Sequence, residues 1–146
     1  MPGNSIQNRV MEQGIKNMEE GAAFKFDYCV TEKIYNGFID LFKDNNPLHT
    51  DEGFAKEKNF SGKVMHGAIL VGFLSHFIGE CLPEKNVIVH GYKINYVKPV
   101  YLNDRLTFEA SITGVFESVN SIEFKYRFIN STKSTVAKGD ISIGII

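Results

Sequence analysis

An acid and an imidazole stand five residues apart in one polar segment of the chain. Asp44 and His49 are separated by Asn-Asn-Pro-Leu, and the proline is expected to prevent a regular helix between them. A turn fixed in this way can direct both side chains into one pocket, where a carboxylate and an imidazole can transfer protons near neutral pH. Taken alone, an Asp and a His in a polar loop are also an ordinary surface feature, so the neighbouring sequence must indicate whether the pair is catalytic.

A glycine follows shortly after the start of the most apolar segment, residues 64–82. The first amides of a helix lack intrahelical acceptors and carry the positive end of its dipole, so Gly67 could let an oxyanion approach the backbone closely. The same glycine could instead allow tight packing between helix and sheet, and the two interpretations are compatible. We interpret His66 as a structural residue that hydrogen-bonds near the helix start. His76 and His90 have no partner that the sequence identifies.

The size, composition and charge of the chain exclude several classes of protein. Its 146 residues, 43% hydrophobic and 23% charged, suit one globular domain. Sixteen basic and 17 acidic side chains leave a net charge of −1, which does not favour nucleic acid or anionic membranes as partners. Cys29 and Cys81 are too few to form a disulfide framework, and no secretory signal is evident, so we expect a cytoplasmic protein. Polar residues interrupt residues 64–82, which therefore predict a core helix and no membrane span.

The hydrophobic pattern predicts a short arm followed by one domain. Residues 1–20 are polar and are expected to form a weakly ordered arm, with a single domain over residues 21–146. A strand from Phe24 leads to Thr31, which can cap a helix that must end before Pro47. A short helix is expected around residues 51–56, before the long apolar one. Alternating segments then predict strands at residues 92–96, 106–112, 122–128 and 141–145, joined by short polar turns typical of antiparallel hairpins.

These elements predict an α+β architecture. Residues 64–82 are apolar around nearly the whole helix, so one neighbour cannot cover them. About five strands, each with one apolar face, can form an antiparallel sheet that wraps around this central helix, an arrangement called the hot-dog fold. The sheet would retain edge strands, which small proteins commonly protect by pairing with a second copy. We therefore expect a homodimer or a higher homo-oligomer.

Four motifs occur in order along the chain, namely Asp-x-Asn-Pro-Leu-His-x-Asp at 44–51, His-Gly at 66–67, Tyr-Val-Lys-Pro-Val at 96–100 and Asn-Asp-Arg-Leu at 103–106. Together they resemble the MaoC-like, (R)-specific enoyl-CoA hydratase family, from about Phe24 to the C-terminus. The resemblance implies a hot-dog domain that interconverts a trans-2-enoyl thioester and water with the (R)-3-hydroxyacyl thioester. It also implies that no metal or redox cofactor takes part and that CoA or an acyl-carrier protein carries the substrate.

The resemblance also implies a role for each matching residue. Asp44 and His49 become the catalytic acid/base pair, and the Gly67 amide becomes the oxyanion donor to the thioester oxygen. Ser75 matches a position that holds the catalytic water or orients the pair. Asn46 and His66 are supporting residues. The acyl pocket is expected to be lined by four apolar residues that are equally compatible with a simple core role, namely Ile69, Phe73, Phe77 and Ile78.

Other chemistry fits the sequence less well. The acidic segment does not follow the calcium-loop pattern and Pro47 disrupts a helical ligand face, so we expect no metal site. An acyl-CoA thioesterase of the same fold, using an acidic residue and the helix-end amide, is the first alternative function. A non-catalytic protein that binds acyl thioesters is the second.

Overall fold

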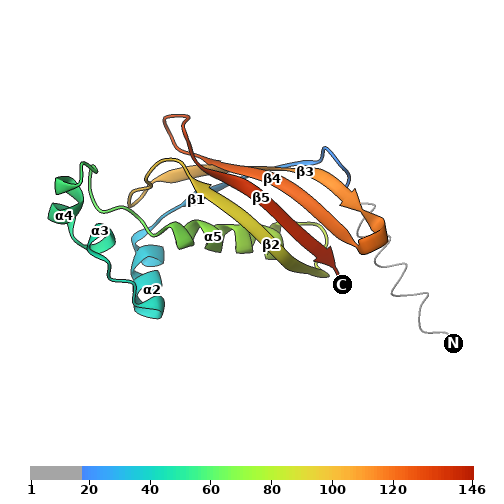
Figure 1. Cartoon of the computed structure of the whole chain (residues 1–146), viewed down its shortest axis with the longest axis horizontal. Coiled ribbons are helices and arrows are strands. Elements are labelled where there is room, and N and C mark those ends of the chain that lie inside the picture. Colours follow the sequence, from blue (N-terminus) through green and yellow to red (C-terminus); the bar gives the residue numbers. More distant parts are fainter. Residues whose placement is uncertain (1–17) are drawn as a thin grey trace.

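The computed structural model describes residues 18–146, and its elements follow the chain order of the sequence prediction (Figure 1). The first seventeen residues of the expected N-terminal arm lie outside this part, whereas Met18 is fully buried in the core. The elements are β1 (Ala23–Cys29), α2 (Glu32–Phe42), α3 (Pro47–Thr50), α4 (Glu52–Glu57), α5 (Gly67–His76), the π-helix η1 (Phe77–Cys81), β2 (Val87–Tyr96), β3 (Arg105–Phe116), the 3-10 turn η2 (Glu117–Val119), β4 (Ser121–Ile129) and β5 (Thr135–Ile145).

The five strands form one antiparallel sheet in the order β1-β3-β4-β5-β2. The β3–β4 and β4–β5 hairpins confirm two of the expected turns. The expected hairpin between β2 and β3 is wrong, because β2 pairs with β5 and β3 pairs with β1 and β4. Alternation shows which face each side chain occupies but not which strands are neighbours, so the sequence could not reveal this crossing.

The connection between β2 and β3, residues 97–104, crosses from one edge of the sheet to the other. It begins with the Val97 N–H donating to the Val136 carbonyl, and it ends with the Asn103 N–H donating to the Val30 carbonyl. Midway, the Val100 carbonyl accepts the Met65 N–H at 2.8 Å. The crossing segment therefore fixes the backbone just before the start of α5.

Helix α5 lies along one face of the sheet (Figure 1). The expected helix over residues 64–82 begins at Gly67, because Val64 instead pairs with Tyr101 in an isolated bridge, and it continues through η1. Within residues 18–146, no helix has the length and apolar character needed to span a bilayer. The inward face of the helix packs into the core, where its most buried side chains are Ile69, Leu70, Phe73, Leu74, Phe77 and Ile78.

The sheet covers only one side of the central helix. On the opposite side Ala68, Gly72, Ser75 and His76 are exposed, so the helix is not enclosed all round as its composition suggested. Thr31 caps the first helix as expected: its Oγ1 accepts the N–H of Ile34 at 3.2 Å.

Candidate active site

The segment between α2 and α3 holds Asp44 in a defined turn. Lys43 ends α2 in the left-handed conformation, with φ of 59°, which turns the chain away from the helix axis. Asp44 Oδ1 then accepts the N–H of Asn46 at 3.2 Å. Asn46 Oδ1 in turn accepts the N–H of Leu48 at 3.0 Å and caps the next helix. These local bonds orient the backbone between the acid and His49.

Pro47 starts a helix instead of preventing one. It occupies the first position of α3, where a missing N–H costs nothing and the fixed φ suits the helix. The expectation that proline excludes helical structure between the two candidates is therefore wrong at this point. The turn lies before the proline, in residues 43–46, and His49 stands on a helix.

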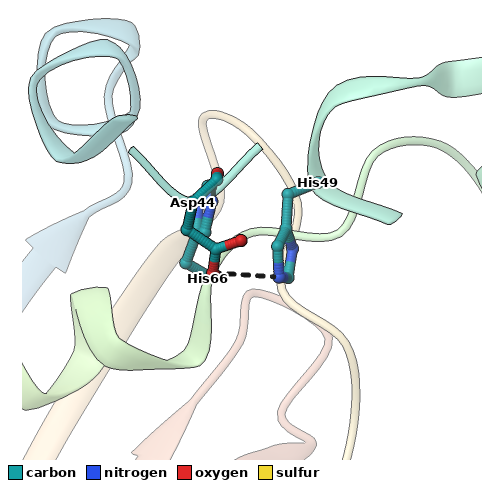
Figure 2. Close-up of side chains that lie close together, drawn as sticks. All are labelled: Asp44, His49 and His66. Atoms are coloured by element: carbon teal, nitrogen blue, oxygen red, sulfur yellow. Dashed lines mark hydrogen bonds and ion pairs between the residues drawn. The ribbon is translucent and has the colours of Figure 1, made fainter. Parts of the chain in front are cut away.

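His49 faces the Asp44 carboxylate, with 4.0 Å between its Nε2 and Asp44 Oδ2 (Figure 2). Its Nδ1 lies 2.7 Å from the Val64 carbonyl, which can only accept, so Nδ1 carries a proton and Nε2 is the ring nitrogen that faces Asp44. The Tyr35 hydroxyl donates to the His49 carbonyl at 2.6 Å. The gap between carboxylate and imidazole exceeds a direct hydrogen bond and is short enough for one small molecule to contact both groups.

His66 supports both members of the pair. It is 2% exposed, and its Nε2 donates to the Asp44 carbonyl at 2.9 Å. Its ring packs between His49, at a centroid distance of 4.0 Å, and Phe38, at 4.7 Å. Figure 2 shows Asp44, His49 and His66 close together. Among the described residues its Nδ1 has no hydrogen-bond partner, so a second proton on this buried ring would have no acceptor.

Gly67 is the first residue of α5 and lies against Tyr96. A Cβ built on Gly67 would approach Tyr96 Cζ to 2.5 Å, so the glycine permits close packing, as one of its two interpretations proposed. Burial, and to a lesser extent Tyr92, raises the pKa of Tyr96, so its hydroxyl stays protonated. Gly67 and Tyr96 both line a cavity of about 330 Å³ that reaches His49. Its other walls include Phe60, Val64, Leu70 and Val100.

Several predicted site residues lie away from this cavity. Ser75 is exposed on α5, nine residues beyond His66 and so roughly 13 Å along the helix axis, and it makes no hydrogen bond to the pair within the described chain. The four residues predicted for the acyl pocket, Ile69, Phe73, Phe77 and Ile78, are buried in the core and do not line the cavity beside His49. Their role toward an acyl chain stays a prediction.

The sequence missed other residues that shape the site. Tyr35 holds the His49 carbonyl from a different helix, and the Val64 carbonyl fixes the His49 tautomer. Neither contact has a local signal, because each joins residues fourteen or fifteen positions apart. Tyr96 stood within a motif of the family resemblance, and its contact with Gly67 gives that motif a physical role.

The structure brings together three groups that could ligate a metal, since Asp44, His49 and His66 each offer an atom within 4.8 Å of the others. The two imidazole rings are stacked with 33° between their planes. Their lone pairs lie in the ring planes, so one ring would have to rotate before both could bind one ion. The carbonyl of Val64 already occupies His49 Nδ1, and that of Asp44 occupies His66 Nε2. This geometry suits proton transfer better than metal binding.

Fold and site together define an antiparallel hot-dog domain with an acid–imidazole pair beside the start of its central helix. A model of the MaoC like domain matches residues 15–133, and the chain belongs to this family. It is 35% identical over 80 residues to an (R)-specific enoyl-CoA hydratase of Aeromonas caviae, an alignment covering 55% of this chain and 60% of the relative. A second (R)-specific enoyl-CoA hydratase, of Rhodospirillum rubrum, is 26% identical over 110 residues, covering 75% of this chain and 76% of the relative.

The solved structure of an (R)-hydratase from A. caviae involved in PHA biosynthesis superposes with a TM-score of 0.81 at 25% identity. The superposition covers 88% of this chain and 98% of that chain. The sequence alignment with the curated A. caviae relative spans less than two thirds of its length, whereas the structural match extends over nearly the whole fold.

Proposed function

We propose that this protein is a lyase that interconverts trans-2-enoyl thioesters and (R)-3-hydroxyacyl thioesters. The observation that carries the proposal is the 4.0 Å approach of Asp44 Oδ2 to His49 Nε2, where His49 lines a cavity that the first residue of α5, Gly67, also lines. The names of the A. caviae and R. rubrum relatives support the same reaction. A paired carboxylate and imidazole can activate water, and a helix N-terminus can stabilise an oxyanion.

Asp44 and His49 supply the proton transfers in this proposal. A water bound between the carboxylate and the His49 Nε2 lone pair loses a proton to the pair as its oxygen adds to the β-carbon. The thioester oxygen gains negative charge and accepts a hydrogen bond from the Gly67 N–H. The pair returns a proton to the α-carbon, and the reverse sequence eliminates water.

His66, Asn46 and Tyr35 act as positioning residues in this proposal. Asn46 caps the helix that carries His49, and Tyr35 holds the carbonyl of His49. His66 fixes the Asp44 backbone and stacks on the face of His49. Ser75 has no contact in the described chain that supports an equivalent role, so its assignment rests on the family resemblance alone.

We infer that a second copy of the chain covers the exposed β2 edge. β2 ends the sheet, and Ile88, Tyr92 and Tyr96 on it are 45–52% exposed. Light scattering is expected to give a mass of two chains or more, and a monomer at micromolar concentration would contradict the inference.

Crotonyl-CoA separates the proposed reaction from its alternatives. A hydratase removes the conjugated enoyl absorbance without releasing free thiol, and chiral chromatography of the product is expected to give the (R)-3-hydroxy isomer. Free thiol would instead support the thioesterase, and binding without either change would support the non-catalytic protein. Repeating the assay with the crotonyl group on an acyl-carrier protein identifies the preferred carrier. Loss of (R) stereochemistry would also overturn the proposal.

A further inference from the structure

A second cluster of reactive side chains lies at the far end of the central helix from Gly67. Tyr28 of β1, His76 at the end of α5 and Cys81 at the end of η1 meet there. The Tyr28 hydroxyl lies 3.0 Å from His76 Nδ1, and Cys81 Sγ lies 3.6 Å from the same nitrogen. The structure therefore gives His76 two partners that the sequence did not identify. None of the three residues lines the cavity beside His49.

The π-helical turn η1 creates the contact between thiol and imidazole. On a regular α-helix, at 3.6 residues per turn, two residues five positions apart point roughly 140° away from each other. The chain instead forms a π-helix over Phe77–Cys81, whose wider turn links residues five apart and brings Cys81 back toward His76. Turns of this kind are rare in proteins, and those that occur are often found at functional sites.

The surroundings of the cluster suit a reactive thiol. His76 is exposed and Cys81 is half-buried, so reagents in solution can reach the pair. The ring of Tyr28 is held by stacking on Phe73 at a centroid distance of 4.6 Å. Burial, and next the neighbouring Cys81, raises the pKa of Tyr28, so its hydroxyl remains a hydrogen-bond donor at physiological pH. The imidazole beside the sulfur is placed to accept the thiol proton during a reaction.

We propose that Cys81 is a modification site at which His76 activates the thiol for exchange with small disulfides such as glutathione disulfide. The Tyr28 hydroxyl turns away from His76 Nδ1, the Cys81 proton moves to that nitrogen, and the thiolate attacks one sulfur of the reagent. A new S–S bond forms at Cys81 as the bond within the reagent breaks. The departing thiolate takes the proton from His76, so Cys81 is oxidised to a mixed disulfide and half of the reagent is reduced to a thiol.

The chain contains its own control for this proposal. Cys29 is also half-buried, but its Sγ donates to the carbonyl of Asn103 at 3.7 Å, an interaction that only the protonated thiol can make. The structure shows no imidazole contact for Cys29 within residues 18–146. The two thiols therefore differ mainly in their neighbours.

Each thiol can be measured alone with dithio-bis-nitrobenzoate, whose coloured product reports the exchange directly. The Cys29→Ser variant retains Cys81 as its single thiol, and the Cys81→Ser variant retains Cys29. At pH 7 we expect Cys81 to react at least about tenfold faster than Cys29. Adding His76→Gln to the Cys29→Ser protein should bring the rate to within about twofold of that of Cys29. Because His76 is exposed, this change is expected to leave the fold intact.

Two further measurements keep the test independent of the His76 variant. In concentrated urea the rates of the two thiols should become equal, because the unfolded chain lacks the cluster. With glutathione disulfide and the wild-type protein, mass spectrometry should find the glutathionyl group on the Cys81 peptide. Equal rates in the native proteins, an unchanged rate with His76→Gln, or modification mainly at Cys29 would overturn the proposal. The outcome does not depend on the hydratase activity.

Discussion

Replacing Gly67 by alanine adds one methyl group against Tyr96. The new Cβ would lie 2.5 Å from Tyr96 Cζ and 2.8 Å from its Cε1 and hydroxyl oxygen, whereas carbon atoms in ordinary contact are about 3.5 Å or more apart. The ring must therefore move by roughly 1 Å. Tyr96 belongs to the edge strand β2 and not to the helix, so its ring can shift without distorting α5.

The structure suggests a small cost in stability and a large one in rate. Overpacking costs about 1–3 kcal/mol, and we expect the stability cost of Gly67→Ala to fall within this range. The methyl group would nevertheless stand beside the Gly67 N–H, where the proposed oxyanion must approach. Loss of one oxyanion donor lowers kcat by about 10²–10³. We expect Gly67→Ala to lower kcat for crotonyl-CoA by this amount, with little change in KM.

Steady-state hydration of crotonyl-CoA measures the effect, and thermal unfolding by circular dichroism checks the fold. The matched control is Tyr96→Leu, alone and combined with Gly67→Ala, because leucine removes the ring that the methyl group displaces. Gly67→Ala should lower kcat by the same factor in the Tyr96→Leu background as in the wild-type protein. Recovery of rate in the double variant, or wild-type kcat in Gly67→Ala, would refute the oxyanion role.

Three other predictions test the packing and capping of the fold. Burial raises the pKa of Tyr126, whose hydroxyl donates to the Lys93 carbonyl. This tyrosine therefore ionises at a lower pH in the unfolded chain than in the folded one, so the free energy of unfolding falls as pH rises above about 10. In urea unfolding, Tyr126→Phe should show a shallower fall with pH. Phe77→Ala should lower the free energy of unfolding in urea by about 3–5 kcal/mol because the ring is fully buried. A change in acyl-chain preference without loss of stability would instead support the prediction that Phe77 lines the acyl pocket. Thr31→Ala should cost about 1 kcal/mol through the lost cap, and a lower kcat would contradict its purely structural role.

Local patterns predicted most of the elements. The alternation in β3, β4 and β5 identified strands whose inward residues are buried, and that in β1 identified a strand whose inward residues are partly buried. Thr31 identified the start of α2. These predictions succeed because burial of one face repeats every second residue in a strand, and because a capping side chain acts within one turn. Pro47 failed as a helix breaker because the effect of proline depends on its position, and at the first position it favours a helix.

Long-range contacts could not be predicted in the same way. The pairing of β2 with β5 and the contact of Tyr35 with His49 join segments whose local sequences contain no record of each other. The start of α5 at Gly67 depends on the Val100 carbonyl, which holds Met65 in the crossing segment. The acyl-pocket prediction used apolar residues on one helix, but composition does not distinguish a pocket wall from the core.

The central claim is that Asp44 and His49 act as one catalytic unit, and a double-mutant cycle on hydration tests it most directly. Asp44→Asn and His49→Gln are each expected to lower kcat/KM by about 10²–10⁴ while the protein remains folded. If the two groups share one water and one proton, the double variant should be about as slow as the slower single variant. Independent effects that multiply, or either single variant with near-normal turnover, would contradict the claim.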